Sequence, residues 1–292
     1  MLVRRKEGYA VARDGSPIYY RLSGNESSAK VPLAFTDGIG CDGYVWKYVE
    51  RDLGADRRIV HWHYRGHGRT PVPRDRKRVS IADSADDLEA VLDAAGAARA
   101  VLLGHSMGVQ VCLETFRRHR DRVAALILVC GSYGNPLRTF KGKDTLDVLL
   151  PYVSFAMRHA PSFVHRLYKS VLPTKLAFAI ATRVEINPEL ARLEDFMPYL
   201  EHMARVDIGL FLEMLGYAGR HSAKEILPTV DVPTLIIAGE HDGFTPRDLS
   251  EEMQGAIAGS TLLVVEGGTH TAPIERPKLV NDAIAKFLER VA

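Results

Sequence analysis

Short apolar runs alternate with amphipathic stretches along most of the chain. Amphipathic periodicity predicts helices over residues 44–53, 81–95, 107–119, 248–257 and 277–291. The apolar runs, each bounded by glycine, proline or polar residues, cover residues 31–36, 58–63, 100–103, 124–130, 234–239 and 261–266. Such runs are typical of buried parallel strands. The alternation predicts an α/β fold with a mostly parallel, doubly wound sheet and helices on both faces.

Two other stretches depart from this alternation. Near the N-terminus, apolar residues at 9–13 and 17–21 flank Asp14-Gly15-Ser16, which predicts an antiparallel hairpin. After Gly131 the alternation stops, and it resumes near Pro233. An interval of about 90 residues is too long for a bare loop. We therefore expect a helical cap over residues 133–224, inserted into a core formed by residues 1–132 and 225–292.

The expected cap is rich in aromatic and methionine side chains, and prolines interrupt its helical signals. These side chains either line a binding site for an apolar acyl or alcohol group or form the core of the cap itself. The prolines are Pro151, Pro161, Pro173, Pro188 and Pro198. The side chains are Phe140, Tyr152, Phe155, Met157, Phe163, Tyr168, Phe178, Phe196, Met197, Tyr199, Met203, Phe211, Met214 and Tyr217.

The strongest chemical signal is Gly104-His105-Ser106-Met107-Gly108, between a predicted strand and a predicted helix. A sharp strand-to-helix turn exposes the serine hydroxyl, and it requires small residues two positions before and after the serine. The pattern therefore predicts Ser106 as a nucleophile, with the N–H of Met107 beside the reacting carbonyl. A plain glycine-rich turn is the alternative.

With this motif the sequence resembles the α/β-hydrolase family. Residues 236–246, which include Glu240-His241-Asp242, resemble the segment that carries the family's acid, and residues 266–270 resemble the segment that carries its histidine. The order serine, acid, histidine also agrees. The resemblance implies a sheet of α/β-hydrolase type and a triad of Ser106, Asp242 and His270.

Each triad member also has a chemical reason. A serine hydroxyl needs a nearby base, a histidine supplies it, and a carboxylate fixes the tautomer of that histidine. Glu240 is a competing acid beside Asp242, and His241 is a competing base. We expect the His105 side chain to point toward the sheet side of the turn, away from the chemistry.

The second oxyanion donor is expected in the loop after the first parallel strand, at Thr36-Asp37-Gly38-Ile39. The family usually has His-Gly before the donor, so the resemblance assigns the Ile39 N–H and leaves Asp37 as a departure. A carboxylate that faced the oxyanion would destabilise it by charge repulsion. Asp37 is therefore expected to point away, either accepting N–H groups of its own loop or pairing with Arg65.

Residues 64–70 resemble a structural loop of the family, with Tyr64 in place of its usual aspartate. The basic residues at 74–78 that follow could form an anion site, but Asp75 interrupts them and the net charge is nearly zero, which favours a solvated loop. His61, His63 and His67 nearby suggest a zinc site, because residues i and i+2 of a strand share a face. No acid or histidine set with matching spacing follows, so locally bonded histidines are the preferred interpretation. We predict no metal and no cofactor.

The composition of the chain limits which classes of partner and which cellular location are expected. With 38 basic and 36 acidic residues the formal net charge is +2, so no basic field exists to attract nucleic acid. No stretch approaches the ~18 apolar residues of a membrane span, and no export signal is visible. Three cysteines disfavour a disulfide framework, which favours a cytoplasmic location. Oligomeric state is left open.

The resulting hypothesis is a serine hydrolase that cleaves an ester-like bond of a small, apolar substrate through an acyl-enzyme. Thioesterase, lactonase, amidase and carbon–carbon bond hydrolase activities stay open, because a fold and a triad do not fix the acyl group. A non-catalytic ligand receptor of the same fold is the alternative from another class.

Overall fold

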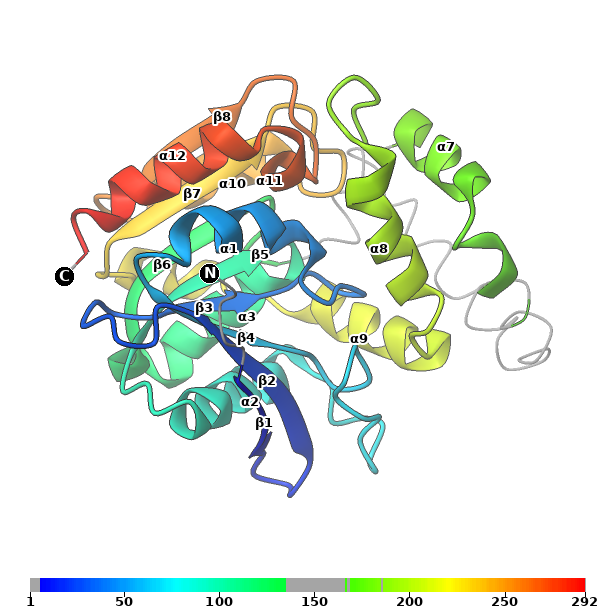
Figure 1. Ribbon diagram of the computed structural model, residues 1–292. Helices are drawn as coiled ribbons and strands as arrows, with labels where there is room; N and C mark the ends of the chain where they lie inside the picture. Colours follow the sequence, from blue (N-terminus) through cyan, green and yellow to red (C-terminus); the bar gives the residue numbers. More distant parts are fainter. Residues whose placement is uncertain (1–5, 135–165, 167–168, 185, 292) are drawn as a thin grey trace.

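A computed structural model describes residues 6–134, 166, 169–184 and 186–291. The strands among these residues form one eight-stranded sheet (Figure 1). The strands lie in the order β1-β2-β4-β3-β5-β6-β7-β8. Their bounds are β1 Lys6–Val11, β2 Pro17–Gly24, β3 Leu33–Thr36, β4 Arg58–Trp62, β5 Ala100–His105, β6 Val123–Val129, β7 Thr234–Gly239 and β8 Thr261–Val265. β2 pairs antiparallel with β1 and with β4, and the other neighbours are parallel. The predicted α/β class and hairpin are confirmed.

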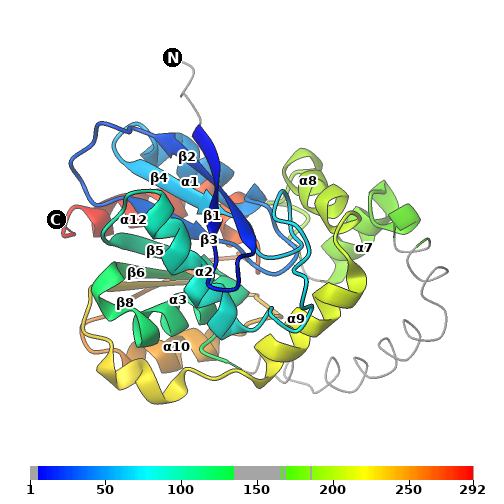
Figure 2. The same cartoon turned by 90° about the horizontal axis from the view of Figure 1, so that it is seen from below.

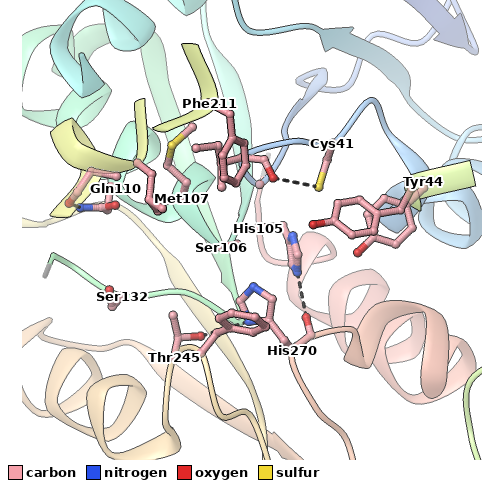
Figure 3. Close-up of a pocket in the computed structure, with 16 residues that line it drawn as sticks. Cys41, Tyr44, His105, Ser106, Met107, Gln110, Ser132, Phe211, Thr245 and His270 are labelled. Atoms are coloured by element: carbon pink, nitrogen blue, oxygen red, sulfur yellow. Dashed lines mark hydrogen bonds between the residues drawn. The ribbon is translucent and has the colours of Figure 1, made fainter. Parts of the chain in front are cut away.

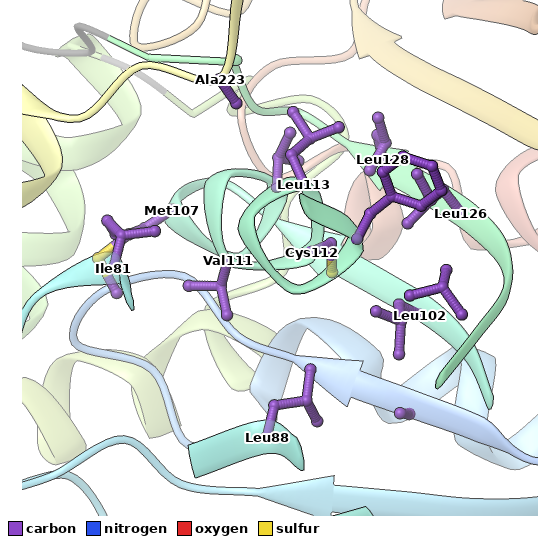
Figure 4. Packing of buried hydrophobic residues seen from close by; sticks show 14 of the residues in the cluster. Ile81, Leu88, Leu102, Met107, Val111, Cys112, Leu113, Leu126, Leu128 and Ala223 are labelled. Atoms are coloured by element: carbon purple, nitrogen blue, oxygen red, sulfur yellow. The ribbon is translucent and has the colours of Figure 1, made fainter. Parts of the chain in front are cut away.

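Helices cover both faces of the sheet. On one face lie α2 (Ile81–Ala94), α3 (Met107–Arg118) and α10 (Arg247–Ala256), and on the other lie α1 (Lys47–Leu53) and α12 (Pro277–Leu288). Successive residues of a strand point to opposite faces. Accordingly Leu102 packs with Leu88 of α2 and Leu113 of α3 (Figure 4), whereas Leu103 belongs to the core on the α1 and α12 side.

Most helix boundaries follow local sequence signals. Ser80 and Asp83 form the capping box at the start of α2 that their spacing predicts. The expected helix from residue 44 begins instead as a 3-10 turn, Tyr44–Trp46, before α1. The sequence did not predict the single-turn helix α11, Ala272–Glu275. Two further 3-10 turns are Arg120–Arg122 and Lys224–Thr229.

In the described part of the expected insertion lie α7 (Lys175–Val184), α8 (Leu193–Met203) and α9 (Ile208–Arg220). They gather on one side of the molecule in both views (Figures 1 and 2). The expectation that Pro198 interrupts a helix is wrong, because this proline lies inside α8. The buried side chains of Phe196, Leu200 and Met203 hold the helix in place. Of the side chains singled out from the sequence, Phe140, Tyr152, Phe155, Met157, Phe163 and Tyr168 lie outside the described residues, as do Pro151 and Pro161.

Candidate active site

The predicted site residues come together at one edge of the sheet. β3, β5, β7 and β8 are parallel, so their carboxyl ends lie on the same edge, where ligands bind in open α/β sheets. The loops that leave these four ends carry Ile39, Ser106, Asp242 and His270, respectively. Four segments far apart in sequence therefore meet at a single place.

Ser106 occupies a strained turn between β5 and α3. Its φ of 56° and ψ of −119° lie outside the regions that L-residues prefer. A Cβ on Gly104 would approach the carbonyl oxygen of Gly108 to 2.4 Å, and a Cβ on Gly108 would approach that of Thr36 to 2.4 Å. The two glycines thus permit the close packing that the turn requires, as the motif predicts.

His270 and Asp242 are hydrogen-bonded. Nδ1 of His270 lies 2.9 Å from Oδ2 of Asp242 and 3.1 Å from Oδ1. Asp242 also accepts the N–H groups of Phe244 and Thr245 and the Thr245 hydroxyl, at 2.9, 2.8 and 2.7 Å. Burial opposes the charged form of this carboxylate, but His270 and these donors outweigh burial and hold the Asp242 pKa below its ordinary value. The carboxylate is thus oriented toward His270.

The competing residues point elsewhere. Glu240 accepts the N–H of Gly267 at 2.8 Å. The side chain of His241 is two-thirds exposed and lies 3.8 Å from the Glu240 carboxylate. Of the two candidate acids, Asp242 is the one that contacts His270.

An apolar cavity of about 280 Å³ opens above the serine (Figure 3). Tyr199 and Phe211 enter its wall from α8 and α9. Phe196 instead packs against Tyr44 and Phe178, in the core of the insertion and its junction with the sheet. Some of these aromatic residues therefore line the cavity, whereas others form part of the core of the insertion. Among the described residues, the wall comprises Gly38, Ile39, Cys41, Tyr44, His105, Ser106, Met107, Gln110, Ser132, Tyr199, Phe211, Leu215, Ala218, Phe244, Thr245 and His270.

Both residues with a predicted oxyanion donor, Ile39 and Met107, line the same cavity as the serine. Met107 is the first residue of α3, so its N–H belongs to the helix N-terminus, where negative charge is favoured. Ile39 follows Gly38, on which a Cβ would lie 3.1 Å from the Ser106 Cβ. The loop after β3 therefore lies directly against the turn that carries Ser106.

Asp37 is buried, and neither expected arrangement is found among the described residues: its carboxylate does not pair with Arg65, and it accepts no N–H of its own loop. Its Oδ2 accepts the Nε2 hydrogen of His61 at 2.8 Å, and His61 Nδ1 accepts from Arg21 Nε at 3.2 Å. Arg65 is committed to Asp14 and Asp87 instead. Burial raises the Asp37 pKa to about 7, against the opposing effect of the nearby Arg21 guanidinium.

His105 also departs from the expectation, because it lines the cavity rather than the sheet side of the turn. Its Nε2 donates to the main-chain oxygen of His270 at 2.9 Å, and the two rings lie 5.0 Å apart (Figure 3). Burial lowers the His105 pKa to about 3, so the ring is neutral at physiological pH. His105 is thus a support for the His270 loop.

Glu275 of α11 holds the same loop from the other side. Its carboxylate accepts the N–H and hydroxyl of Thr269, both at 2.7 Å, and the hydroxyl of Thr271 at 3.0 Å. It also accepts the N–H of Asn187, from the insertion, at 3.1 Å. The residues on both sides of His270 are therefore fixed by one buried carboxylate.

The histidines that suggested zinc are bonded locally. His63 Nδ1 accepts the N–H of Arg69 at 3.0 Å, and His61 contacts Asp37 and Arg21. Within the described ranges, no group of three or more His, Cys, Asp or Glu side chains has the arrangement of a metal site. Arg76 and Arg78 in the basic stretch are exposed and pair with Asp207 and Asp83. That stretch is a solvated loop, as predicted.

Two global observations complete the picture. Cys41, Cys112 and Cys130 are buried and free. Among the helices of the described residues, none is both long and apolar enough to cross a membrane.

Comparison with known proteins agrees with this architecture. The sequence pattern of the alpha/beta hydrolase fold matches residues 32–277. The chain belongs to the alpha/beta hydrolase fold family. Its eight-stranded, mostly parallel sheet with a helical insertion is of the type that this family name describes.

Individual relatives of this alpha/beta hydrolase are distant. The esterase RhEst1 from Rhodococcus sp. is 26% identical, with a TM-score of 0.77 and coverage of 100% of both chains. The enol-lactonase from Burkholderia xenovorans is 22% identical, with a TM-score of 0.76, covering 97% of this chain and 100% of its own. A provisionally named carbamate hydrolase, RutD, from Caulobacter vibrioides is 25% identical over 272 residues, which are 93% of this chain and 95% of the relative.

Thr245, Glu275 and His105 support the site without having been predicted in that role. A threonine three residues after the acid is a local signal that could have revealed the contact with Asp242. Nothing local indicates that Glu275 turns back onto residues 269 and 271, since α11 itself lacked a recognisable helical pattern.

Proposed function

We propose that this alpha/beta hydrolase is a serine hydrolase that cleaves an ester-like bond of a small, apolar substrate. The observation that carries the proposal is the hydrogen bond of 2.9 Å from His270 Nδ1 to the buried Asp242. His270 and Ser106 lie in the wall of the same cavity. A histidine bonded in this way presents Nε2 as a base. A serine on a strained turn beside it is the group such a base activates.

The reaction proceeds in two halves. Ser106 Oγ attacks the carbonyl carbon while its proton passes to His270 Nε2, and Asp242 stabilises the resulting imidazolium. The N–H groups of Met107 and Ile39 bind the developing oxyanion. His270 then protonates the leaving alcohol, and a water molecule, deprotonated by the same nitrogen, hydrolyses the acyl-enzyme and frees Ser106.

The cavity supports a small and mainly apolar substrate. Its volume of about 280 Å³ lies at the lower end of the range of roughly 300–1,000 Å³ found for drug-sized ligand sites. Aromatic and aliphatic side chains, among them Tyr44, Phe211, Leu215 and Phe244, make up much of its wall. A short acyl chain would bury apolar area there without leaving a polar group unsatisfied.

A series of p-nitrophenyl esters with acyl chains of increasing length tests this proposal. We expect a burst of p-nitrophenol equal to the enzyme concentration, followed by steady turnover with a maximum at short or medium chains. If the protein binds esters of this series but turns none of them over, the receptor alternative is favoured. Thioester and lactone analogues of the preferred acyl group separate the remaining hydrolase activities, which the names of the relatives keep open.

We also propose that residues 133–224 act as a cap that selects the substrate, with the catalytic core in residues 1–132 and 225–292. Tyr199 and Phe211 support this division, because they reach the cavity from α8 and α9. Limited proteolysis is expected to cut between residues 133 and 224, and a covalent acyl analogue is expected to slow the cuts. Cuts spread evenly over the chain would argue against a separate cap.

A further inference from the structure

Two histidines hold Gly40, which follows the proposed oxyanion donor Ile39. The Gly40 N–H donates to His67 Nε2 at 3.0 Å, and the Gly40 carbonyl accepts from His202 Nδ1 at 2.9 Å. His67 lies in the loop after β4, whereas His202 lies in α8, in the helical insertion. A residue of the insertion is therefore bonded directly to the oxyanion loop.

The tautomer of His202 follows from its partners. Nε2 accepts the N–H of Gly68 at 2.8 Å, so the hydrogen resides on Nδ1, which donates to the Gly40 carbonyl. The ring is 2% exposed, and both nitrogens are used. His202 thus ties α8, the loop after β3 and the loop after β4 together through one neutral imidazole.

From His202 a continuous chain of hydrogen bonds leads to the Ile39 N–H. The Gly40 carbonyl that His202 contacts belongs to the same peptide unit as the Cys41 N–H, which donates to the Gly38 carbonyl at 3.2 Å. The Gly38 carbonyl in turn belongs to the same peptide unit as the Ile39 N–H. Each donor in such a series polarises the next peptide, so the last N–H becomes a better donor.

Because of its backbone conformation, Gly40 depends on hydrogen bonds from outside its loop to fix the orientation of its peptide groups. Its φ of 77° is in the left-handed region, which glycine adopts readily but does not prefer strongly over other conformations. A loop with such a residue has alternative peptide orientations. The bonds to His67 and His202 select one of them.

We propose that His202 is a positioning residue for the oxyanion hole: from α8 it fixes and polarises the peptide chain that ends at the Ile39 N–H. The insertion then contributes to transition-state stabilisation as well as to the cavity wall. This inference rests on the proposed function, because it assumes that Ile39 binds an oxyanion.

Two substitutions of similar size separate the two bonds of His202. In His202→Asn the amide nitrogen takes the place of Nδ1 and keeps the donor to Gly40. In His202→Gln the amide reaches the place of Nε2, so its oxygen accepts from Gly68 but no donor faces Gly40. His119→Gln is the control. His119 is also a buried histidine, but it contacts Asp86 and Glu89 at the C-terminal end of α3, whereas Ser106 lies at the N-terminal end of that helix.

The readouts are kcat and KM for p-nitrophenyl butyrate, and the inhibition constants of butylboronic acid and of butyrate. We expect His202→Gln to lower kcat by roughly 10- to 100-fold with KM within about threefold, because complete loss of one oxyanion donor costs about 10²–10³. Butylboronic acid, which forms a tetrahedral adduct with the serine, should lose affinity in parallel, whereas butyrate should not. His202→Asn should retain most of the wild-type kcat.

Equal kcat values for His202→Asn and His202→Gln, or a parallel loss of butyrate and boronic acid affinity, would overturn the inference. Thermal unfolding of all variants shows whether His202→Gln loses more stability than His119→Gln, and the Asn/Gln comparison stays decisive in either case. Failure of the wild-type protein to turn over p-nitrophenyl butyrate and to react with a fluorophosphonate at Ser106 would reject the proposed function itself. Normal wild-type turnover with no difference between the two variants would reject only the role of His202.

Discussion

His105 donates its Nε2 hydrogen to the main-chain oxygen of His270, across 2.9 Å. The residue that precedes the proposed nucleophile thereby supports the residue proposed as its base. His105 is the last residue of β5, and His270 lies in the loop after β8, so the bond links the ends of two strands that are not neighbours in the sheet. The relative placement of Ser106 and His270 depends on this link.

The first prediction concerns that link. His105→Gln places an amide N–H near the position of Nε2 and should retain most of the activity, whereas His105→Phe fills the space without a donor. We expect kcat of the Phe variant to fall roughly fivefold, as loss of a hydrogen bond worth about 1 kcal/mol would give. Steady-state kinetics on p-nitrophenyl butyrate measure the effect. Equal rates for the two variants would show that the bond is irrelevant to catalysis.

A second prediction concerns the activity of Asp37 variants. Asp37→Asn keeps an acceptor for the His61 Nε2 hydrogen, so activity should stay within about tenfold of wild type. Asp37→Ala leaves that buried donor without its partner and should lose more. A large gain in turnover for Asp37→Asn would instead mean that the carboxylate faces the oxyanion.

Asp37 also predicts a pH dependence of stability. Its pKa of about 7 in the folded protein exceeds the ordinary 3.8, so between these values the native state holds a proton that the unfolded state has lost. The contribution of this group to stability is therefore complete below about pH 4 and lost as pH rises through 7. From pH 5 to pH 8, wild type should lose roughly 2–3 kcal/mol relative to Asp37→Asn in urea unfolding. A constant difference would contradict the raised pKa.

The parts of the site that the sequence predicts are those with local signals. Ser106 is marked by glycines two residues away on each side, and Asp14-Gly15 marks the hairpin turn. His202 could not be predicted, because its partner Gly40 lies far away in sequence and only the packing of the insertion on the core brings the two together. Glu275 contacts the nearby residues 269 and 271, but α11, which turns its carboxylate back onto them, has no recognisable helical pattern in the sequence.

The Asp37–His61 bond illustrates the same limit. The sequence draws attention to both residues, but it suggests Arg65 or the N–H groups of the loop as partners of Asp37, and for His61 only an unspecified local bond in preference to a metal. The parallel pairing of β3 with β4 places Phe35 opposite His61, which brings the end of β3 next to that histidine. Register decides this contact, and apolar patterning alone does not specify register between parallel strands.

A further prediction tests the carboxylate that holds residues 269 and 271. Glu275→Gln replaces one acceptor oxygen by an N–H₂ group, so at least one of its four donors loses its partner. We expect a loss of about 1–3 kcal/mol in unfolding free energy and a kcat lowered by roughly tenfold. Glu240→Gln is the control, since Glu240 is at the surface and accepts the N–H of Gly267. Similar effects of both substitutions would contradict the role of Glu275.

The proposed triad also predicts non-additive losses. Ser106→Ala and His270→Ala should each lower kcat severely, and the double variant should be little slower than either one, because the two residues act as a unit. Asp242→Asn is expected to lose somewhat less. Single-turnover kinetics on an activated ester give the comparison. Multiplicative losses would place His270 outside the mechanism, and retention of its role by His241 would refute the assignment.

The most direct measurement is the intact mass of the protein after reaction with a fluorophosphonate. Wild type should gain one phosphonyl group, located on Ser106 by peptide mapping, while Ser106→Ala should remain unlabelled, keep its fold and lose turnover by roughly 10⁴- to 10⁶-fold. Equal labelling of Ser106→Ala, or activity retained by it, would contradict the account that Ser106 is the nucleophile of this alpha/beta hydrolase.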